Sequence, residues 1–219
     1  MMCADMIDLS RDLNLFETHG VELLHMDIMD GHYVPNVALG PQLCGQIARA
    51  SSIPQDIHLM VEETDRFVPI FVPLAPRYIS FHPETSRHPV RTIQSIRNAG
   101  IRPGIALDPA VTLESVMPLL GEVDLVCVMT VSPGYAGQAI IPWTIDKIRD
   151  LAELRKSRGY RYLIEVDGNV SWKNIPLMVD AGAEILVLGT SSLFQPDMDR
   201  DTMLRRLKEM PCWNGNGKN

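Results

Sequence analysis

Short apolar runs that end in polar or glycine-rich residues recur along this chain, and they constrain its fold more than any other feature. Seven such runs end near Asp27, Met60, His82, Leu107, Val131, Asp167 and Gly189, at intervals of 22 to 36 residues. Amphipathic stretches with helical periodicity separate them, which is the pattern of repeated strand–helix units. Because each strand is followed by a crossover helix, the strands are expected to lie parallel. The pattern therefore predicts an α/β fold built on a parallel sheet.

The number of helices narrows this prediction. Helices are expected over residues 41–50, 63–74, 89–99, 113–120, 142–158, 171–181 and 199–210, and one more, 5–19, precedes the first strand. Eight helices and seven strands are most simply explained by a (β/α)₈ TIM barrel whose first strand lies upstream of Met1. A chain of 219 residues with 46% hydrophobic residues suits one domain. We expect one barrel domain over 1–210 and a polar tail over 211–219.

The side chains within the runs divide into two faces. Successive residues of a strand point to opposite sides of the sheet. The first run therefore has a polar face with His25, Asp27 and Met29, and a purely apolar face between them. The runs that end at Met60 and Asp167 repeat this division. Reactive side chains are thus predicted to gather on one face of the sheet.

Two imidazoles and two carboxylates are expected to meet where these runs end. They belong to His25, Asp27, His58 and Asp167, and the active site of such a barrel lies at the carboxyl ends of its strands. An N₂O₂ donor set suits one Zn²⁺, Mn²⁺, Fe²⁺ or Co²⁺ ion, with Mg²⁺ also possible, and the absence of thiolates argues against a closed structural zinc site. A single buried histidine is more often structural, but the four together favour a metal site.

Three loops are rich in glycine and small polar residues. They are TVSPGYAGQ after the sixth barrel strand, DGN at 167–169 and GTSS at 189–192. Taken singly, each is compatible with an ordinary turn. Loops after strands seven and eight are, however, the usual phosphate cradle of this barrel. Together they predict that a small anionic group binds at the same end as the metal.

Six segments carry a resemblance to a known family. In order and spacing, HMDIMDGHYVPN, DIHLM, FHPET, VMTVSPGYAGQ, IEVDGN and LGTSSLF resemble the ribulose-phosphate 3-epimerase family, most closely its D-allulose-6-phosphate 3-epimerase branch. The resemblance extends from about Met2 to Phe194. It implies a ribulose-phosphate-binding type of barrel that inverts C3 of a ketose phosphate through an ene-diolate.

The resemblance also implies roles for individual residues. His25, Asp27, His58 and Asp167 match the family's metal ligands, and Asp27 and Asp167 match its acid/base pair. The matched substrate-binding residues are His58, Met29, Met60, Met129, Gly134, Tyr135, Ala136, Gly137, Gln138, Gly168, Asn169, Gly189, Thr190 and Ser191.

Two loop sequences bear on the substrate. The ribulose branch usually reads GFGGQ and DGG, where this chain has Gly-Tyr-Ala-Gly-Gln and Asp-Gly-Asn. Both differences favour conversion of D-allulose 6-phosphate to D-fructose 6-phosphate. The alternative is 3-epimerisation between ribulose 5-phosphate and xylulose 5-phosphate. A further alternative is an inactive truncated barrel that only binds a sugar phosphate.

Other chemistries and partners are disfavoured. Related decarboxylases carry an Asp-x-Lys-x-x-Asp run, but no lysine follows Asp27, and the five lysines fall in predicted helices or the tail, so Schiff-base chemistry lacks its nucleophile. A net charge of −7 argues against nucleic acid. Scattered cysteines and the absence of a long apolar segment predict a cytoplasmic protein without a membrane partner, and a homo-oligomer is expected. His82 and Glu84 fit either an outer support of the site or a surface turn.

Overall fold

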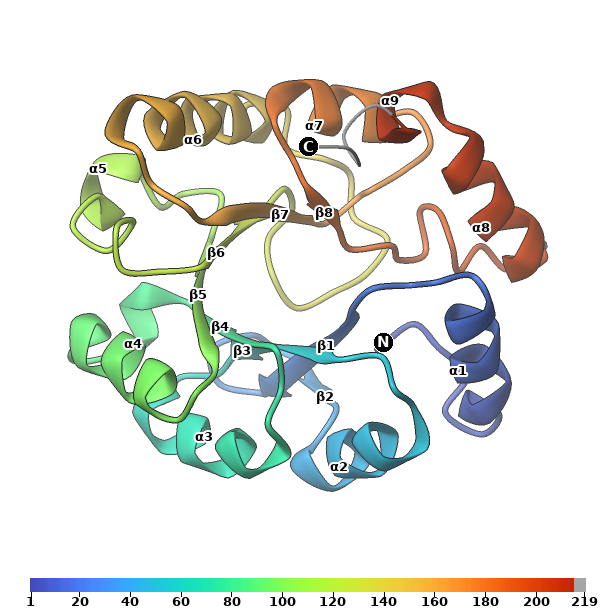
Figure 1. Ribbon diagram of the computed structural model, residues 1–219, viewed down its shortest axis with the longest axis horizontal. Helices are drawn as coiled ribbons and strands as arrows, with labels where there is room; N and C mark the ends of the chain where they lie inside the picture. Colours follow the sequence, from blue (N-terminus) through green and yellow to red (C-terminus); the bar gives the residue numbers. More distant parts are fainter. Residues whose placement is uncertain (215–219) are drawn as a thin grey trace.

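A curved sheet surrounded by helices forms the body of the molecule (Figure 1). The computed structural model describes residues 1–214. Its strands are β1 (Leu24–Asp30), β2 (Val37–Ala38), β3 (Gln55–Met60), β4 (Tyr78–Phe81), β5 (Arg102–Leu107), β6 (Leu125–Met129), β7 (Leu163–Asp167) and β8 (Ile185–Leu186). They are ordered β2-β1-β3-β4-β5-β6-β7-β8. The short β2 pairs antiparallel to β1, and every other pairing is parallel.

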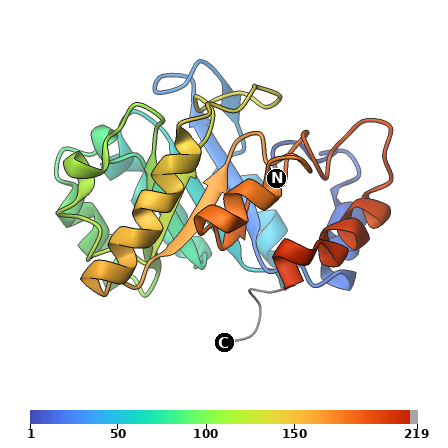
Figure 2. The same ribbon diagram turned by 90° about the horizontal axis from the view of Figure 1, so that it is seen from above.

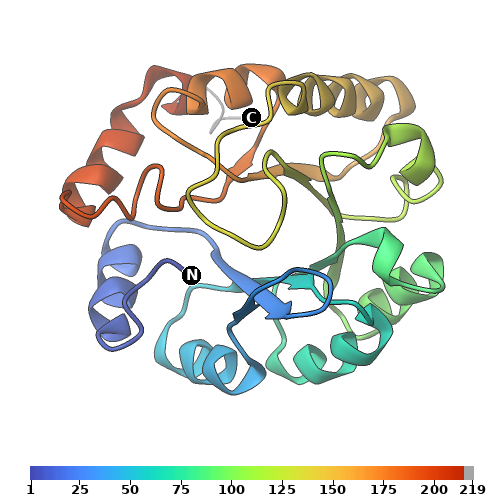
Figure 3. The same ribbon diagram turned by 180° about the vertical axis from the view of Figure 1, so that it is seen from behind.

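Helices follow the parallel strands and cover the outside of the sheet (Figures 1 and 3). They are α1 (Leu9–Thr18), α2 (Pro41–Ala50), α3 (Thr64–Phe71), α4 (Pro89–Asn98), α5 (Leu113–Val116), α6 (Thr144–Arg158), α7 (Ile175–Ala181), α8 (Arg200–Glu209) and α9 (Pro211–Asn214), with 3₁₀ turns η1 (Val72–Leu74) and η2 (Pro83–Thr85). The α/β barrel-type fold predicted from the alternation of elements is confirmed.

Four helices are at least four residues shorter than the sequence pattern predicts. Those expected over 5–19 and 63–74 form only over Leu9–Thr18 and Thr64–Phe71. The helix expected over 113–120 ends at Val116, because Pro118 has no N–H to continue the helical hydrogen bonds. The helix expected over 171–181 begins at Ile175, with a proline in its first turn. Proline is favoured there, since that N–H would have no helical partner.

The two faces of the sheet differ as the alternation predicts. Outward side chains such as Met26, Ile57 and Val166 are fully buried in the main core against the helices. Each such side chain stabilises the fold by about 1.5–3 kcal/mol. The inward face instead holds His25, Asp27, His58 and other polar groups, with small apolar clusters between them. The outer core therefore holds the sheet, and the interior is left for polar chemistry.

The sheet is curled but not closed within residues 1–214. Strands β1 and β8 face each other without a ladder between them, because β8 ends the strand order and β1 pairs with β2 and β3. The amino group of Met1 donates a hydrogen bond to the His25 carbonyl at this opening. An apolar cavity of about 210 Å³ lies beside it, lined by Phe16, Leu24 and Leu186 among others.

The first four residues of the expected polar tail have a regular structure. Residues 211–214 form the short helix α9, which contacts α7 and α8. The rest of the predicted polar tail, 215–219, lies outside the described residues. Among the helices within residues 1–214, none is both long and apolar enough to cross a bilayer.

Candidate active site

Four predicted ligand residues meet on the inward face of three strands. His25 and Asp27 lie on β1, Asp27 is in register with His58 of β3, and Asp167 ends β7. The Nε2 atom of His25 lies 3.4 Å from Oδ1 of Asp27 and 3.9 Å from Oδ2 of Asp167. The Nδ1 atom of His58 also lies 3.9 Å from Oδ2 of Asp167. Residues that the sequence separates by up to 142 positions (167 − 25) thus form one cluster.

The cluster has the geometry of a metal site. One ligand atom from each residue lies within 4.8 Å of all the others. Ligand atoms around a tetrahedral ion with bonds of about 2.1 Å are about 3.4 Å apart, close to the separations seen here. His25 Nε2 and His58 Nδ1 are buried and have no hydrogen-bond partner within the described part of the protein. Two buried imidazole nitrogens directed at two carboxylates fit a divalent cation well.

Both imidazoles are held from behind by other buried side chains. Nδ1 of His25 is 2.6 Å from Oδ2 of Asp56 and 3.6 Å from Oε1 of Glu165. Nε2 of His58 is 3.1 Å from Nε2 of His82. Asp56, His82 and Glu165 are at most 1% exposed. The sequence pattern placed Asp56 and Glu165 on the polar face without giving them a role, and the surface-turn alternative for His82 is wrong because this side chain is fully buried.

The electrostatics of the cluster are governed by burial and by the closeness of its charges. Burial opposes charge on His25, but the carboxyl groups of Glu165 and Asp27 outweigh it and raise the pKa of His25 well above its usual value. Burial acts to raise the pKa of Asp27, yet His25 lowers it overall. For Asp167, burial and then the repulsion from Asp27 raise the pKa to about 6, against the opposing effect of His25. A bound cation would favour the ionised form of both carboxyls.

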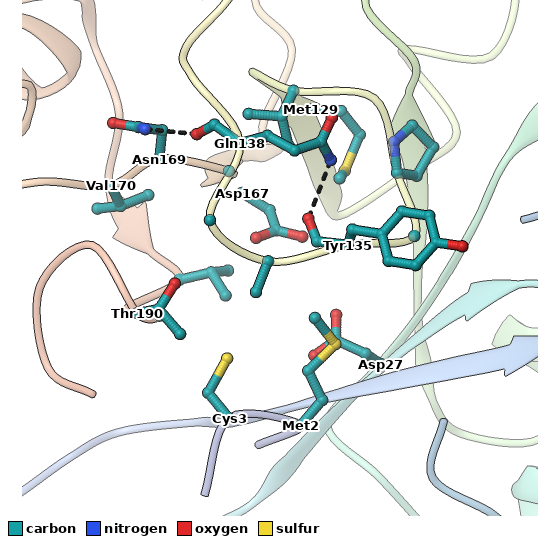
Figure 4. A pocket seen from close by; sticks show the side chains of 18 of the residues that line it. Met2, Cys3, Asp27, Met129, Tyr135, Gln138, Asp167, Asn169, Val170 and Thr190 are labelled. Atoms are coloured by element: carbon teal, nitrogen blue, oxygen red, sulfur yellow. Dashed lines mark hydrogen bonds between the residues drawn. The ribbon is translucent and has the colours of Figure 1, made fainter. Parts of the chain in front are cut away.

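A cavity lies directly above this cluster (Figure 4). Asp27 and Asp167 approach it from opposite sides, and Met129 also borders it. Met29 and Met60 line it too and pack with Val34 in a small apolar cluster of their own. The cavity thus has two carboxylates and an apolar patch of methionines next to the ligand cluster.

His25 and His58 are the two predicted site residues that do not border this cavity. His58 is fully buried beneath the cavity floor, and His25 borders the apolar cavity beside β8 instead. A direct contact between His58 and a substrate, implied by the family resemblance, stays a prediction. The other thirteen predicted substrate-binding residues all line the cavity. They are Met29, Met60, Met129, Gly134, Tyr135, Ala136, Gly137, Gln138, Gly168, Asn169, Gly189, Thr190 and Ser191.

The loops around the mouth are tied to one another. Figures 2 and 3 show the loop after β6 beside the loop after β1, at the same end of the sheet. Asn36 donates a hydrogen bond to the Gly134 carbonyl at 2.8 Å, and the Tyr135 hydroxyl donates to the Pro35 carbonyl. A Cβ atom on Gly134 would lie 3.1 Å from Cβ of Val34, so the loops approach closely at this point.

The DGN turn after β7 is fixed by its own backbone and by the β6 loop. Gly168 has φ +106°, and an added Cβ would lie 2.6 Å from Cγ2 of Val131. Only glycine suits both that conformation and that contact. Asn169, at φ +42°, donates from Nδ2 to the Gln138 carbonyl at 2.5 Å. The amide of Asn174 in turn donates to Oδ1 of Asn169.

Further residues line the cavity that sequence reasoning did not select. They are Met1, Met2, Cys3, Val131, Ser132, Pro133, Val170, Val187 and Leu188. Val131, Ser132 and Pro133 lie inside the TVSPGYAGQ loop, and Val170, Val187 and Leu188 stand one or two positions from a predicted motif. The segment that begins the described chain has no motif at all, so only the tertiary structure places it here.

Solved structures with similar folds include enzymes of other families. A mutant tryptophan synthase α-subunit from Pyrococcus furiosus matches with a TM-score of 0.67 at 13% identity, covering 97% of this chain and 94% of that one. Phosphoribosyl anthranilate isomerase from Thermococcus kodakaraensis matches with a TM-score of 0.63 at 10% identity, covering 94% and 92%. At such identities the likeness shows the fold alone.

Sequence comparison is more specific. Ribulose-phosphate 3-epimerase 1 of Cupriavidus necator is 41% identical over 216 residues, covering 95% of this chain and 89% of the relative. The ribulose-phosphate 3-epimerase of Bacillus subtilis is 36% identical over 198 residues, covering 90% and 91%. The model of the ribulose-phosphate 3 epimerase family matches residues 1–194, which include every described strand and all four residues of the ligand cluster. This chain is therefore a member of the ribulose-phosphate 3-epimerase family, whose enzymes are isomerases that act on sugar phosphates.

Proposed function

We propose that this chain inverts C3 of a ketose phosphate with the help of one divalent metal ion. The observation that carries the proposal is the position of Asp27 and Asp167, which face one cavity from opposite walls beside two unpartnered imidazole nitrogens. Inverting a carbon next to a ketone requires removal of a proton from one face and delivery of a proton to the other. Two opposed carboxyl groups meet that requirement.

Each aspartate would act on its own face of C3. In one direction Asp27 is the base that accepts the C3 proton and Asp167 is the acid that delivers one. In the reverse reaction the two roles are exchanged. Both carboxyl groups are nearly buried, so little bulk water competes with them for the proton. Met29, Met60 and Met129 supply an adaptable apolar wall without acidic protons.

The four ligand residues would hold the ion at the cavity floor. His25 and His58 provide Nε2 and Nδ1, and Asp27 and Asp167 provide one oxygen each. A bound divalent ion would supply positive charge that stabilises the negative charge developing on the substrate oxygens, by roughly 3 kcal/mol or more. The donor set suits Zn²⁺, Mn²⁺, Fe²⁺ or Co²⁺, with Mg²⁺ a weaker match to its two imidazoles.

The glycine-rich side of the cavity is proposed to hold the phosphate group. Among the described residues that line the cavity, none is a lysine or an arginine. Backbone amides and hydroxyls must then provide the hydrogen bonds, which Gly168, Asn169, Thr190 and Ser191 can supply in addition to the amides of residues 134–137. This arrangement suits a monophosphate at the end of a short sugar.

Two substrates are proposed for separate reasons. The relatives are named for ribulose phosphate, which favours the pair D-ribulose 5-phosphate and D-xylulose 5-phosphate. The Gly-Tyr-Ala-Gly-Gln and Asp-Gly-Asn loops favour D-allulose 6-phosphate, and both loops line the cavity. We place the pentulose first because the relatives named for ribulose phosphate match 90% or more of this chain, whereas the loop differences involve only a few residues.

Turnover of both sugar phosphates by the metal-loaded protein tests the proposal. A higher kcat/KM for D-ribulose 5-phosphate than for D-allulose 6-phosphate would support the pentulose, and the reverse ratio would support the hexulose. Reaction in deuterated water should place deuterium at C3 of the product. Product free of deuterium, or binding of both sugar phosphates with turnover of neither, would contradict proton transfer through the two aspartates. Homo-oligomerisation, a cytoplasmic location and the absence of nucleic acid or membrane partners stay predictions from the sequence.

A further inference from the structure

We propose that His82 is a positioning residue that sets which nitrogen of His58 carries the proton, and so directs the Nδ1 lone pair of His58 at the metal site. The inference rests on the proposed metal site, because it concerns the side of the imidazole that faces the ion. It adds a residue outside the four ligands. Its test must therefore separate a failure of His82 from a failure of the site itself.

The two histidines meet on the inward side of the sheet, His58 on β3 and His82 directly after β4. His58 of β3 is in register with Ser80 of β4, and His82 comes two residues later, so its side chain points to the same inward face. The Nε2 atoms of His58 and His82 are 3.1 Å apart, and both side chains are fully buried. At that distance the contact is a hydrogen bond, which needs one donor and one acceptor.

Both imidazoles are fully buried, and neither has a hydrogen bond to a carboxylate among the described residues. A buried imidazolium without such a partner is unfavourable, so each ring is neutral and carries one proton. Nδ1 of His58 faces Asp167 at 3.9 Å and has no hydrogen-bond partner among the described residues. If this nitrogen offers its lone pair to an ion, the proton of His58 must sit on Nε2 and be donated to His82.

The far side of His82 supports the same direction of donation. Once Nε2 of His82 accepts, its proton sits on Nδ1, which lies 3.7 Å from Oε1 of Glu84. The opposite arrangement would turn a bare Nδ1 lone pair toward the negatively charged Glu84 carboxylate, which is electrostatically unfavourable. The Tyr33 hydroxyl donates to the same Glu84 oxygen at 2.8 Å. Its ring lies against the His82 ring with centroids 4.7 Å apart, which holds the imidazole in place.

His25 is held by a different kind of partner. Its Nδ1 contacts the carboxylate of Asp56 at 2.6 Å, which is the usual carboxylate–histidine arrangement behind a metal. The corresponding partner of His58 is the neutral imidazole of His82. Because a neutral imidazole can reverse its own tautomer, the orientation of the pair depends on Glu84 and Tyr33 at the outer end. The segment after β4 therefore affects metal binding although it supplies no ligand.

The test compares Zn²⁺ affinity of the full chain and two variants by competition with a chelator. His82→Phe keeps a flat ring of similar size but removes the acceptor, so a buried N–H of His58 loses its partner. Its dissociation constant should rise about 10- to 100-fold. His82→Gln keeps an acceptor oxygen and should stay within about threefold of the parent. His32→Phe, at a side chain 71% exposed beside the site, is the matched control and should leave Zn²⁺ affinity unchanged.

Nitrogen-15 NMR of the unmodified protein decides the question even if His82→Phe fails to fold. The Zn²⁺-loaded protein should show the His58 proton on Nε2 and the His82 proton on Nδ1. A His58 proton on Nδ1, or a folded His82→Phe variant that binds Zn²⁺ as tightly as the parent, would overturn the role of His82. The His58→Ala variant tests the metal site independently of His82. If that variant also keeps its Zn²⁺, the metal site itself is misassigned.

Discussion

His58 and Asp167 lie 109 positions apart in the sequence (167 − 58), yet Nδ1 of His58 is 3.9 Å from Oδ2 of Asp167. The two side chains come from β3 and β7, on different parts of the curled sheet. No hydrogen bond from residues 1–214 satisfies His58 Nδ1, so the pair is arranged to share a third partner. A divalent cation between them would accept the lone pair of His58 Nδ1. It would also offset the repulsion between Asp27 and Asp167.

Loss of the His58 imidazole should remove most of the bound metal. In His58→Ala, one of four ligands is gone and the two aspartates keep only His25 between them. We expect metal content measured by elemental analysis to fall to less than about a tenth of the parent value, because removal of a ligand costs several kcal/mol of binding. His32→Ala, at an exposed histidine, should retain full occupancy. Equal occupancy in the His58→Ala variant would show that the ligand set is wrong.

Metal binding should release protons, and the number released should rise as the pH falls. In the metal-free protein the pKa of His25 is raised well above its usual value, so His25 holds a proton at pH 7. The pKa of Asp167 is raised to about 6, so Asp167 also holds one below that pH. An ion must displace both protons, and affinity should weaken about tenfold per pH unit for each proton released. Calorimetry in buffers of different ionisation enthalpy should give about one proton near pH 7.5 and more below pH 6.

A constant affinity for Zn²⁺ from pH 7.5 to pH 5.5 would contradict that prediction. Asp167→Asn provides the control, because it removes the group that titrates near pH 6. Binding to this variant will be weaker overall, but the additional proton below pH 6 should no longer appear. The far-ultraviolet circular dichroism signal must be unchanged over the same range, so that unfolding does not mimic weaker binding.

Asp167→Asn should also abolish most epimerisation while the fold survives. The amide is nearly the same size but cannot exchange a proton with C3. Loss of a positioned acid or base lowers the rate by about 10²- to 10⁴-fold, and loss of a ligand adds to this. Asp180→Asn on α7 is the matched control, because it changes a carboxyl outside the cavity and should keep the parent rate. A variant at position 167 that retains more than about a tenth of the activity would rule out this acid/base role.

Gly168 should be far less tolerant of alanine than another glycine with positive φ. In Gly168→Ala, the new Cβ would meet Val131 at 2.6 Å as well as strain the backbone at φ +106°. Gly100 has φ +78°, and a Cβ added there would have nothing within 4 Å, so Gly100→Ala measures backbone strain alone, about 1 kcal/mol. We expect the free energy of unfolding, measured with urea, to fall by at least about 1 kcal/mol more at position 168. Equal losses would show that the turn relaxes easily.

Asn169 should hold the loop after β6 over the cavity. Asn169→Gly keeps the positive φ but removes the hydrogen bonds to Gln138 and from Asn174. Asn169→Asp keeps an acceptor for Asn174 and loses only the donor to Gln138. Both variants should be cut faster by protease near Tyr135 and should raise KM several-fold with a smaller change in kcat, since one hydrogen bond contributes about 1 kcal/mol. Unchanged cleavage and KM would mean that other contacts fix the loop.

Much of this site followed from the sequence, because a strand alternates its faces whatever surrounds it. The alternation separated His25 and Asp27 from the apolar residues of β1, and the structure shows that apolar face in the main core. The spacing of the runs predicted parallel strands, and β1 and β3 to β8 do pair in parallel in chain order, whereas the short antiparallel β2 was not predicted. Local chemistry also located both ends of α2, whereas α1, α3, α5 and α7 are each at least four residues shorter than expected.

The partners behind the ligands were decided only by the tertiary structure. Asp56 and His82 carry no motif that distinguishes a buried support from a surface residue, and their role depends on which strands lie side by side in the curled sheet. The same holds for the contact between Asn169 and Gln138, which joins two loops. Periodicity is a property of each strand, whereas these contacts depend on strand register, sheet curvature and the exclusion of water. Only packing of the whole chain fixes those three.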